Sequence, residues 1–186
     1  MLEVLVVAAE GSDFMDIRLI VEIADLLALT AVISIACYME LRSARIPNVL
    51  TGSGMVMGLL FGMLPGGPSF AASVLGLIIG FGALFVFYAV GGIGGGDVKL
   101  MGAVGALLGV THIVPLLFHT ALIGAVMAIL VLIWKGNALA RCKHYFRKLI
   151  GRATDEQLSK ETLTVPYGVA IAIGTLITLL RMGSTP

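Results

Sequence analysis

Long apolar runs alternate with short polar breaks along most of the chain. A helix needs roughly 20 apolar residues to cross a bilayer, so the pattern predicts spans at about 20–39, 49–64 and 70–90. A polar, basic break containing Pro47 separates the first two runs, and Pro65-Gly66-Gly67-Pro68 predicts a turn before the third. The first half of the chain is therefore expected to cross a membrane three times.

The apolar stretch over 98–134 is too long for one helix. We expect a break at 111–115, where Pro115 follows a polar pair, and therefore an unusually short fourth helix over 98–110. A fifth span over 113–134 and a sixth over 164–180 complete the pattern. The predicted fold is an all-α polytopic membrane bundle of about six transmembrane helices.

Composition supports a membrane protein. Of the 186 residues, 59% are hydrophobic and 12% are charged, whereas about a quarter of the residues in a soluble domain are charged. We expect residues 1–186 to form a single membrane-embedded domain, with a short acidic segment at 1–19 and a basic loop at 135–163. The net charge of +1 gives no reason to expect a nucleic-acid partner, and none is predicted. The two cysteines are too few for a zinc site.

The basic residues predict the orientation. With six spans, the loops at 40–48, 91–99 and 135–163 lie on one side, and they hold ten of the twelve Lys and Arg residues. An excess of Lys and Arg marks cytoplasmic loops, so both termini are expected outside the cytoplasm. Within the third loop, residues 135–152 have the spacing of an amphipathic interfacial helix, which would contact anionic lipid or a protein partner.

A glycine-rich stretch from Gly91 to Lys99 contains the most distinctive chemistry. Asp97 is the only acidic residue between Glu40 and Asp155. A carboxylate at membrane depth is costly, and so it indicates a functional site. Two alternatives stay open: a glycine-rich turn with an N-capping Asp, and the ion site of a small transporter on a broken helix.

Glu40 and Asp97 are predicted to lie at the same cytoplasmic edge, at the end of the first helix and the start of the fourth. Two neighbouring carboxyl groups, one protonated and one ionised, can act together as general acid and general base. The three histidines are scattered and show no metal-ligand spacing. We therefore expect no metal or other cofactor.

Three motifs in order resemble those of the type IV prepilin peptidases, which are GxGD intramembrane aspartic proteases. The motifs are Arg45-Ile46-Pro47-Asn48 after an acidic residue, Gly94-Gly95-Gly96-Asp97 with Lys99, and Val165-Pro166-Tyr167-Gly168. The resemblance implies that Asp97 and Glu40 are catalytic and that Gly94, Gly95, Gly96 and Lys99 form the active-site loop. It implies supporting roles for Arg45, Pro47, Asn48, Pro166, Tyr167 and Gly168.

The short length is similar to that of the prepilin peptidases of tight-adherence (Flp) pilus systems. The resemblance then implies an endopeptidase of the bacterial inner membrane that cuts at the cytoplasmic face. Its partner would be a prepilin with a short basic leader and a hydrophobic helix, held among membrane lipids. The larger bifunctional type has a four-cysteine zinc region and an N-methyltransferase activity, and this chain lacks those cysteines.

Glu40 departs from the family pattern, which has Asp seven residues before the Pro of Ile-Pro-Asn. The extra methylene moves the carboxyl group by roughly 1 Å, a shift that can cost about a hundredfold in rate. A tolerated variant, an engineered inactive form and a degenerate prepilin-binding homologue are the three interpretations. Asp25 is a poor substitute, because it lies roughly 22 Å earlier along the helix.

Overall fold

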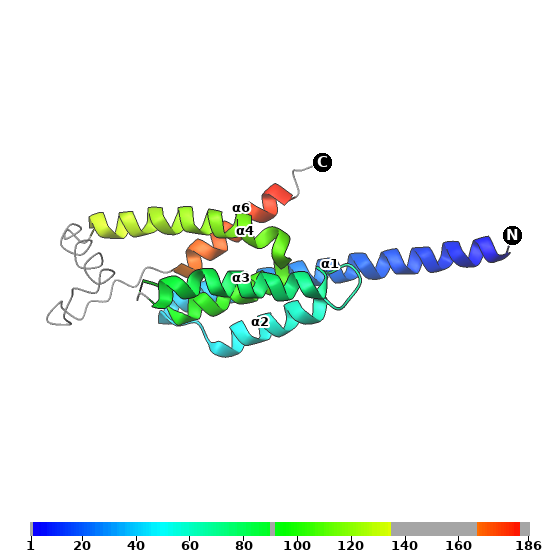
Figure 1. Cartoon of the computed structure of the whole chain (residues 1–186), viewed down its shortest axis with the longest axis horizontal. Coiled ribbons are helices and arrows are strands. Elements are labelled where there is room, and N and C mark those ends of the chain that lie inside the picture. The colour runs from blue at the N-terminus through cyan, green and yellow to red at the C-terminus, as the bar shows by residue number, and fades with distance from the viewer. Residues whose placement is uncertain (1, 90–91, 135–166, 183–186) are drawn as a thin grey trace.

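The computed structural model describes residues 2–89, 92–134 and 167–182, and Figure 1 shows them as a bundle of helices. No strand occurs in these residues, so the prediction of an all-α fold is confirmed. The helices are α1 (Leu2–Ser43), α2 (Asn48–Phe61), α3 (Phe70–Ala89), α4 (Gly95–Trp134) and α6 (Tyr167–Met182). The predicted interfacial segment at 135–152 lies outside the described residues.

The helices match the predicted spans in part. The ends of α2 and α3 lie within three residues of those predicted. Helix α1 instead begins at Leu2 and continues without a break through residues 2–19, which were expected to form a separate segment before the first span. Three described segments are long and apolar enough to cross a membrane, namely Met15–Ser43, Phe70–Ala89 and Gly95–Val131. Asn48–Phe61 and Tyr167–Met182 are shorter apolar helices. The total of six spans stays a prediction, because length and apolar composition alone support three.

The break in the long apolar stretch lies at Gly109, and the predicted position at 111–115 is wrong. Gly109 has φ 71° and ψ 174°, which interrupts α4. Glycine adopts positive φ without the steric cost that a Cβ imposes. Pro115 lies inside the helical segment that follows the break. The segment before the break, 95–108, is only about 21 Å long at 1.5 Å per residue, so the prediction of a short helix here is correct.

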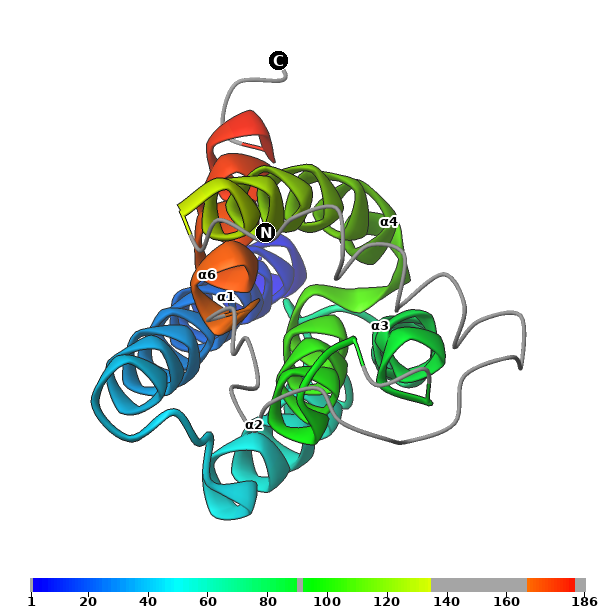
Figure 2. The same cartoon turned by 90° about the vertical axis from the view of Figure 1, so that its left-hand side faces the viewer.

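Helix α4 occupies the centre of the bundle and contacts each of the other described helices. Figure 1 shows its first part running beside α3 and its second part turning back over α6. The view in Figure 2 shows α6 between α1 and the second part of α4. The end of α1 and the starts of α2, α4 and α6 all lie at one end of the bundle. This end brings together segments that are far apart in the sequence.

Glycines allow the helices around α4 to approach closely. Gly76 of α3 and Gly105 of α4 lie with their backbones in contact, and a Cβ on either residue would collide with the other's carbonyl oxygen. Gly58 of α2 lies equally close to the backbone of Ala106. Small residues of this kind are typical of helix interfaces in membranes, where close backbone packing replaces the hydrophobic driving force.

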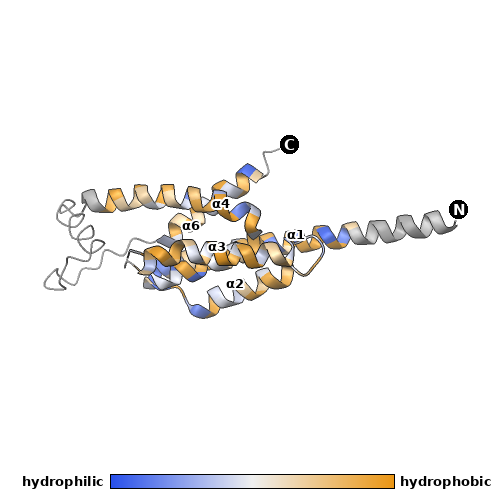
Figure 3. Ribbon diagram, viewed as in Figure 1, coloured by the Kyte–Doolittle hydropathy of each residue, from blue (hydrophilic) through white to orange (hydrophobic). Residues whose placement is uncertain are grey.

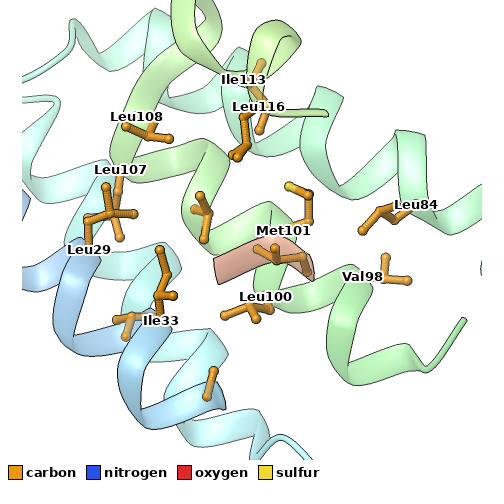
Figure 4. Packing of buried hydrophobic residues seen from close by; sticks show 14 of the residues in the cluster. Leu29, Ile33, Leu84, Val98, Leu100, Met101, Leu107, Leu108, Ile113 and Leu116 are labelled. Atoms are coloured by element: carbon orange, nitrogen blue, oxygen red, sulfur yellow. The ribbon is translucent and has the colours of Figure 1, made fainter. Parts of the chain in front are cut away.

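The buried core is formed by α1, α3, α6 and both parts of α4. Figure 4 shows side chains of this cluster, among them Leu29 of α1 beside Leu107 of α4. Leu29, Leu100 and Met101 are at most 1% exposed. Many large apolar side chains are also exposed, and Figure 3 shows apolar residues along the length of the helices. An outer surface of this composition suits a lipid environment.

Candidate active site

Asp97 lies in the first turn of α4 with its side chain 6% exposed. The carbonyl oxygen of Gly94 accepts hydrogen bonds from the backbone N–H of Asp97 at 3.1 Å and of Val98 at 3.4 Å. A Cβ on Gly94 would lie 3.0 Å from Asp97 Oδ2, which is tighter than an ordinary contact. The absence of a side chain at Gly94 thus leaves room for the carboxylate to fold back over the start of its own helix.

Glu40 lies near the end of α1 with its side chain 8% exposed. Its carboxylate faces the first turn of α6, where the backbone N–H groups of Tyr167, Gly168 and Val169 are directed toward it. A Cβ on Gly168 would collide with Glu40 Oε2. A helix N-terminus offers free N–H groups and a positive dipole end to an anion. The start of α6 therefore forms the wall against which Glu40 is held.

The structure brings Glu40 and Asp97 close enough for their charges to interact. Within the described residues, Glu40 Oε2 and Asp97 Oδ1 are both buried without a hydrogen-bond partner. Buried polar atoms are nearly always satisfied, so two orphaned carboxylate oxygens in one place need an explanation. A proton and a water molecule shared between the two groups, or a bound substrate, would supply the missing bonds.

The loop between α1 and α2 fills the space between the carboxylate-bearing segments. Ile46 Cβ would lie 3.2 Å from a Cβ on Gly96, and Ile46 Cδ1 would lie 3.6 Å from a Cβ on Gly168. The chain enters this loop through Ala44, whose φ is 51°, and leaves it at Pro47, the N-cap residue of α2. Ile46 thus packs against the starts of both α4 and α6.

Lys99 contacts a second predicted site residue and not Asp97. Its Nζ donates a hydrogen bond of 2.8 Å to Oδ1 of Asn48, the first residue of α2. This hydrogen bond links the first turn of α4 to the start of α2. Arg45 is exposed in the loop, and Gly95 lies against the Tyr88 ring, with 3.3 Å between a Cβ built at Gly95 and Cε2.

Most of the residues expected at the site lie at this end of the bundle. The exception is Pro166, which lies outside the described residues. Asp25 lies fifteen residues before Glu40 in the same unbroken helix, roughly 22 Å away. Sequence reasoning missed Tyr88 and Gly124, which contact the site segments from α3 and from the second part of α4. No local motif marks these two residues.

The side chains at this site are carboxylates, a phenol, an amide and an amine. Within the residues that the structure describes, no group of three His, Cys, Asp or Glu side chains gathers in a way that could hold a metal ion. The chemistry available from the described side chains is proton transfer between two carboxyl groups, with hydroxyl and backbone N–H donors beside them.

The chain is similar to known peptidases. The type IV leader peptidase family matches residues 27–129, a region that includes Glu40 and Asp97. The prepilin leader peptidase/N-methyltransferase of Neisseria gonorrhoeae is 32% identical over 121 residues, covering 61% of this chain and 42% of the relative. The Aeromonas hydrophila protein of the same name is 30% identical over 161 residues, covering 83% and 48%.

The matches to the curated relatives thus cover somewhat less than half of the relatives' own length. No solved structure matched the chain. The family match covers more than half of the chain and includes Glu40 and the glycine-rich stretch before Asp97. The chain therefore belongs to the type IV leader peptidase family.

Proposed function

We propose that the chain is a membrane aspartic endopeptidase that removes the basic leader of Flp or type IV-like prepilins at the cytoplasmic membrane face. One observation carries the proposal. Two buried carboxylates, Glu40 and Asp97, come together from helices far apart in the sequence, and each has an oxygen without a hydrogen-bond partner. Such a pair has the composition that peptide hydrolysis by acid–base catalysis needs.

The proposed reaction uses one protonated and one ionised carboxyl group. The ionised group takes a proton from water, the water oxygen attacks the scissile carbonyl carbon, and the protonated group gives its proton to the carbonyl oxygen. When the C–N bond breaks, the leaving nitrogen takes the proton that the first group had accepted from water. The second group takes back a proton from the hydroxyl of the tetrahedral intermediate as the carboxylic acid product forms, and the pair returns to its starting state.

The family implies a prepilin substrate, and the surface of the bundle suits one. The hydrophobic helix of a prepilin would lie among the lipid-facing helices, with its basic leader on the side of the Lys- and Arg-rich loops. We propose that this chain acts as a single membrane-embedded domain of the bacterial inner membrane. We also propose that it does not methylate the new N-terminus, because its two cysteines cannot build a four-cysteine zinc region.

Glu40 favours a second candidate, a prepilin-binding homologue that does not cleave. The family pattern has Asp at this position, and the longer Glu arm shifts the carboxyl group by roughly 1 Å. In this alternative the chain binds a prepilin without cleaving it. Cleavage measurements on the parent chain and on E40D separate the two candidates.

The test is co-expression with candidate prepilins, scored by the mobility shift that follows leader removal. Asp97→Asn is expected to abolish cleavage while the protein remains folded, because the amide is nearly isosteric but cannot cycle a proton. Glu40→Asp is expected to preserve or raise cleavage. Asp25→Asn makes the same carboxyl-to-amide change roughly 22 Å from Glu40 along α1 and serves as the control.

Cleavage by Asp97→Asn at the parent rate would remove Asp97 from the chemistry and refute the aspartic proposal. Inactivity of both the parent chain and E40D on every cognate prepilin would support the non-cleaving homologue. The mass of the mature pilin tests the proposed lack of methyltransferase activity. An unmethylated N-terminus is expected when no other methyltransferase is present.

A further inference from the structure

Tyr167, the first residue of α6, has its ring pressed against Gly124 in the second part of α4. A Cβ on Gly124 would lie 2.6 Å from Tyr167 Cε2, 3.2 Å from Cζ and 3.3 Å from the hydroxyl oxygen. Separations below 3.0 Å essentially never occur for a real Cβ. The ring and its hydroxyl therefore occupy space that only a glycine at position 124 leaves open.

Tyr167 also lies beside the carboxylate site. Its neighbour Gly168 lies directly against Glu40 Oε2, and its own backbone N–H is directed toward the Glu40 carboxylate. The ring is half-buried, so the hydroxyl is held at the boundary between the packed helices and the site. Its phenolic hydroxyl is a neutral O–H donor beside the carboxylate pair.

We propose that the Tyr167 hydroxyl donates a hydrogen bond to the scissile carbonyl oxygen as negative charge develops on it, and that Gly124 is the positioning residue that holds the hydroxyl there. This inference rests on the proposed peptidase function. A donor preorganised toward a developing oxyanion lowers the barrier without having to reorient during the reaction. Gly124 acts only through the ring, because it lies in α4 behind Tyr167.

Tyr167→Phe removes the hydroxyl and leaves the ring against Gly124. Losing one such donor costs on the order of a hundredfold in kcat, and KM and the midpoint of thermal unfolding are expected to stay unchanged. Gly124→Ala forces the far edge of the ring to move, and a displacement near 1 Å can also cost about a hundredfold. The α4 helix should persist, since Ala favours helix over Gly by about 1 kcal/mol.

Gly82→Ala is the matched control, because it makes the same change within α3, where a Cβ meets nothing within 4 Å. Its kcat and KM on a prepilin substrate are expected to equal those of the parent chain. The double variant G124A/Y167F is expected to be no slower than Y167F alone, because a positioning residue has no further effect once the positioned hydroxyl is gone.

The outcomes separate this inference from the function on which it rests. Failure of the parent chain to cleave any prepilin overturns both. A cleaving parent with Y167F at the parent kcat, or with only KM raised, leaves the peptidase function standing and overturns the role of the hydroxyl. If the losses of kcat in the two single variants multiply in G124A/Y167F, the positioning role of Gly124 is overturned. That result requires Gly124 to act on catalysis other than through the Tyr167 hydroxyl.

Discussion

The packing of Gly58 against α4 leads to a quantitative prediction about stability. A Cβ on Gly58 would lie 2.6 Å from the carbonyl carbon of Ala106, 2.7 Å from Leu107 N and 2.8 Å from Ala106 Cβ. Two of these three atoms belong to the backbone, so no side-chain rotation can relieve the contacts. In Gly58→Ala the helices must separate by roughly 0.8 Å, the difference between 2.6 Å and an ordinary contact of 3.4 Å.

The cost follows from two opposing effects. Overfilling a packed interface costs about 1–3 kcal/mol, and replacing Gly by Ala in a helix gains about 1 kcal/mol. Gly52 lies in the same helix, and a Cβ there meets nothing within 4 Å. Gly52→Ala therefore gains the higher helix propensity of alanine without a steric clash. The difference between the two variants isolates the packing cost, and G58A should be less stable than G52A by about 1–3 kcal/mol.

The measurement is the free energy of unfolding of both variants and the parent chain in mixed micelles of a mild detergent and SDS. Helicity followed by circular dichroism reports the transition. G58A is expected to unfold at the lowest SDS fraction, and G52A at or above the value of the parent. Equal stability of G58A and G52A would refute the close contact between α2 and the Ala106 backbone.

Two further predictions concern the site itself. The described site offers two carboxylates and no cluster that could hold a metal ion. Dialysis against EDTA should therefore leave leader removal unchanged. Activity restored only by a divalent cation would contradict the aspartic mechanism. Lys99→Met removes the hydrogen bond to Asn48 and should lower the unfolding free energy by about 1 kcal/mol. Asn48→Leu should give the same loss. A double variant that loses twice as much would show that the two residues act independently.

The local pattern of the sequence predicts the helices well. Apolar runs and the turn at 65–68 place α2 and α3 within a few residues of their observed ends. Lipid-exposed backbone must be helical, so the length of each apolar run sets the length of its helix. The break in α4 was misplaced for a physical reason. Proline is the usual helix breaker, but Pro115 lies six residues after Gly109, inside the helical segment that follows the break. The break falls at Gly109 because glycine tolerates the positive φ.

The two carboxylates of the site could also be selected from the sequence, because isolated charges in apolar sequence are few. The contacts around these two carboxylates could not be predicted from the sequence. The contact of Gly124 with Tyr167 and that of Gly58 with Ala106 join residues from different helices, and no periodicity within one helix encodes the partner. The same holds for the bond from Lys99 to Asn48. Such contacts depend on how the helices pack, which a single sequence read locally does not reveal.

Glu40 stands where the family pattern has Asp, and its contact with Gly168 predicts a measurable coupling between positions 40 and 168. Glu40 Oε2 occupies the position that a Cβ on Gly168 would need, so Gly168→Ala should displace the carboxylate and lower leader cleavage, by about a hundredfold for a shift near 1 Å. Glu40→Asp shortens the arm by one methylene and withdraws the carboxylate from this space. Adding G168A to E40D should therefore cost much less than adding it to the parent chain, both in cleavage rate and in the midpoint of thermal unfolding. Comparing the four forms as a double-mutant cycle measures this coupling. An equal effect of G168A in both backgrounds would show that the longer Glu arm does not depend on the space that Gly168 leaves.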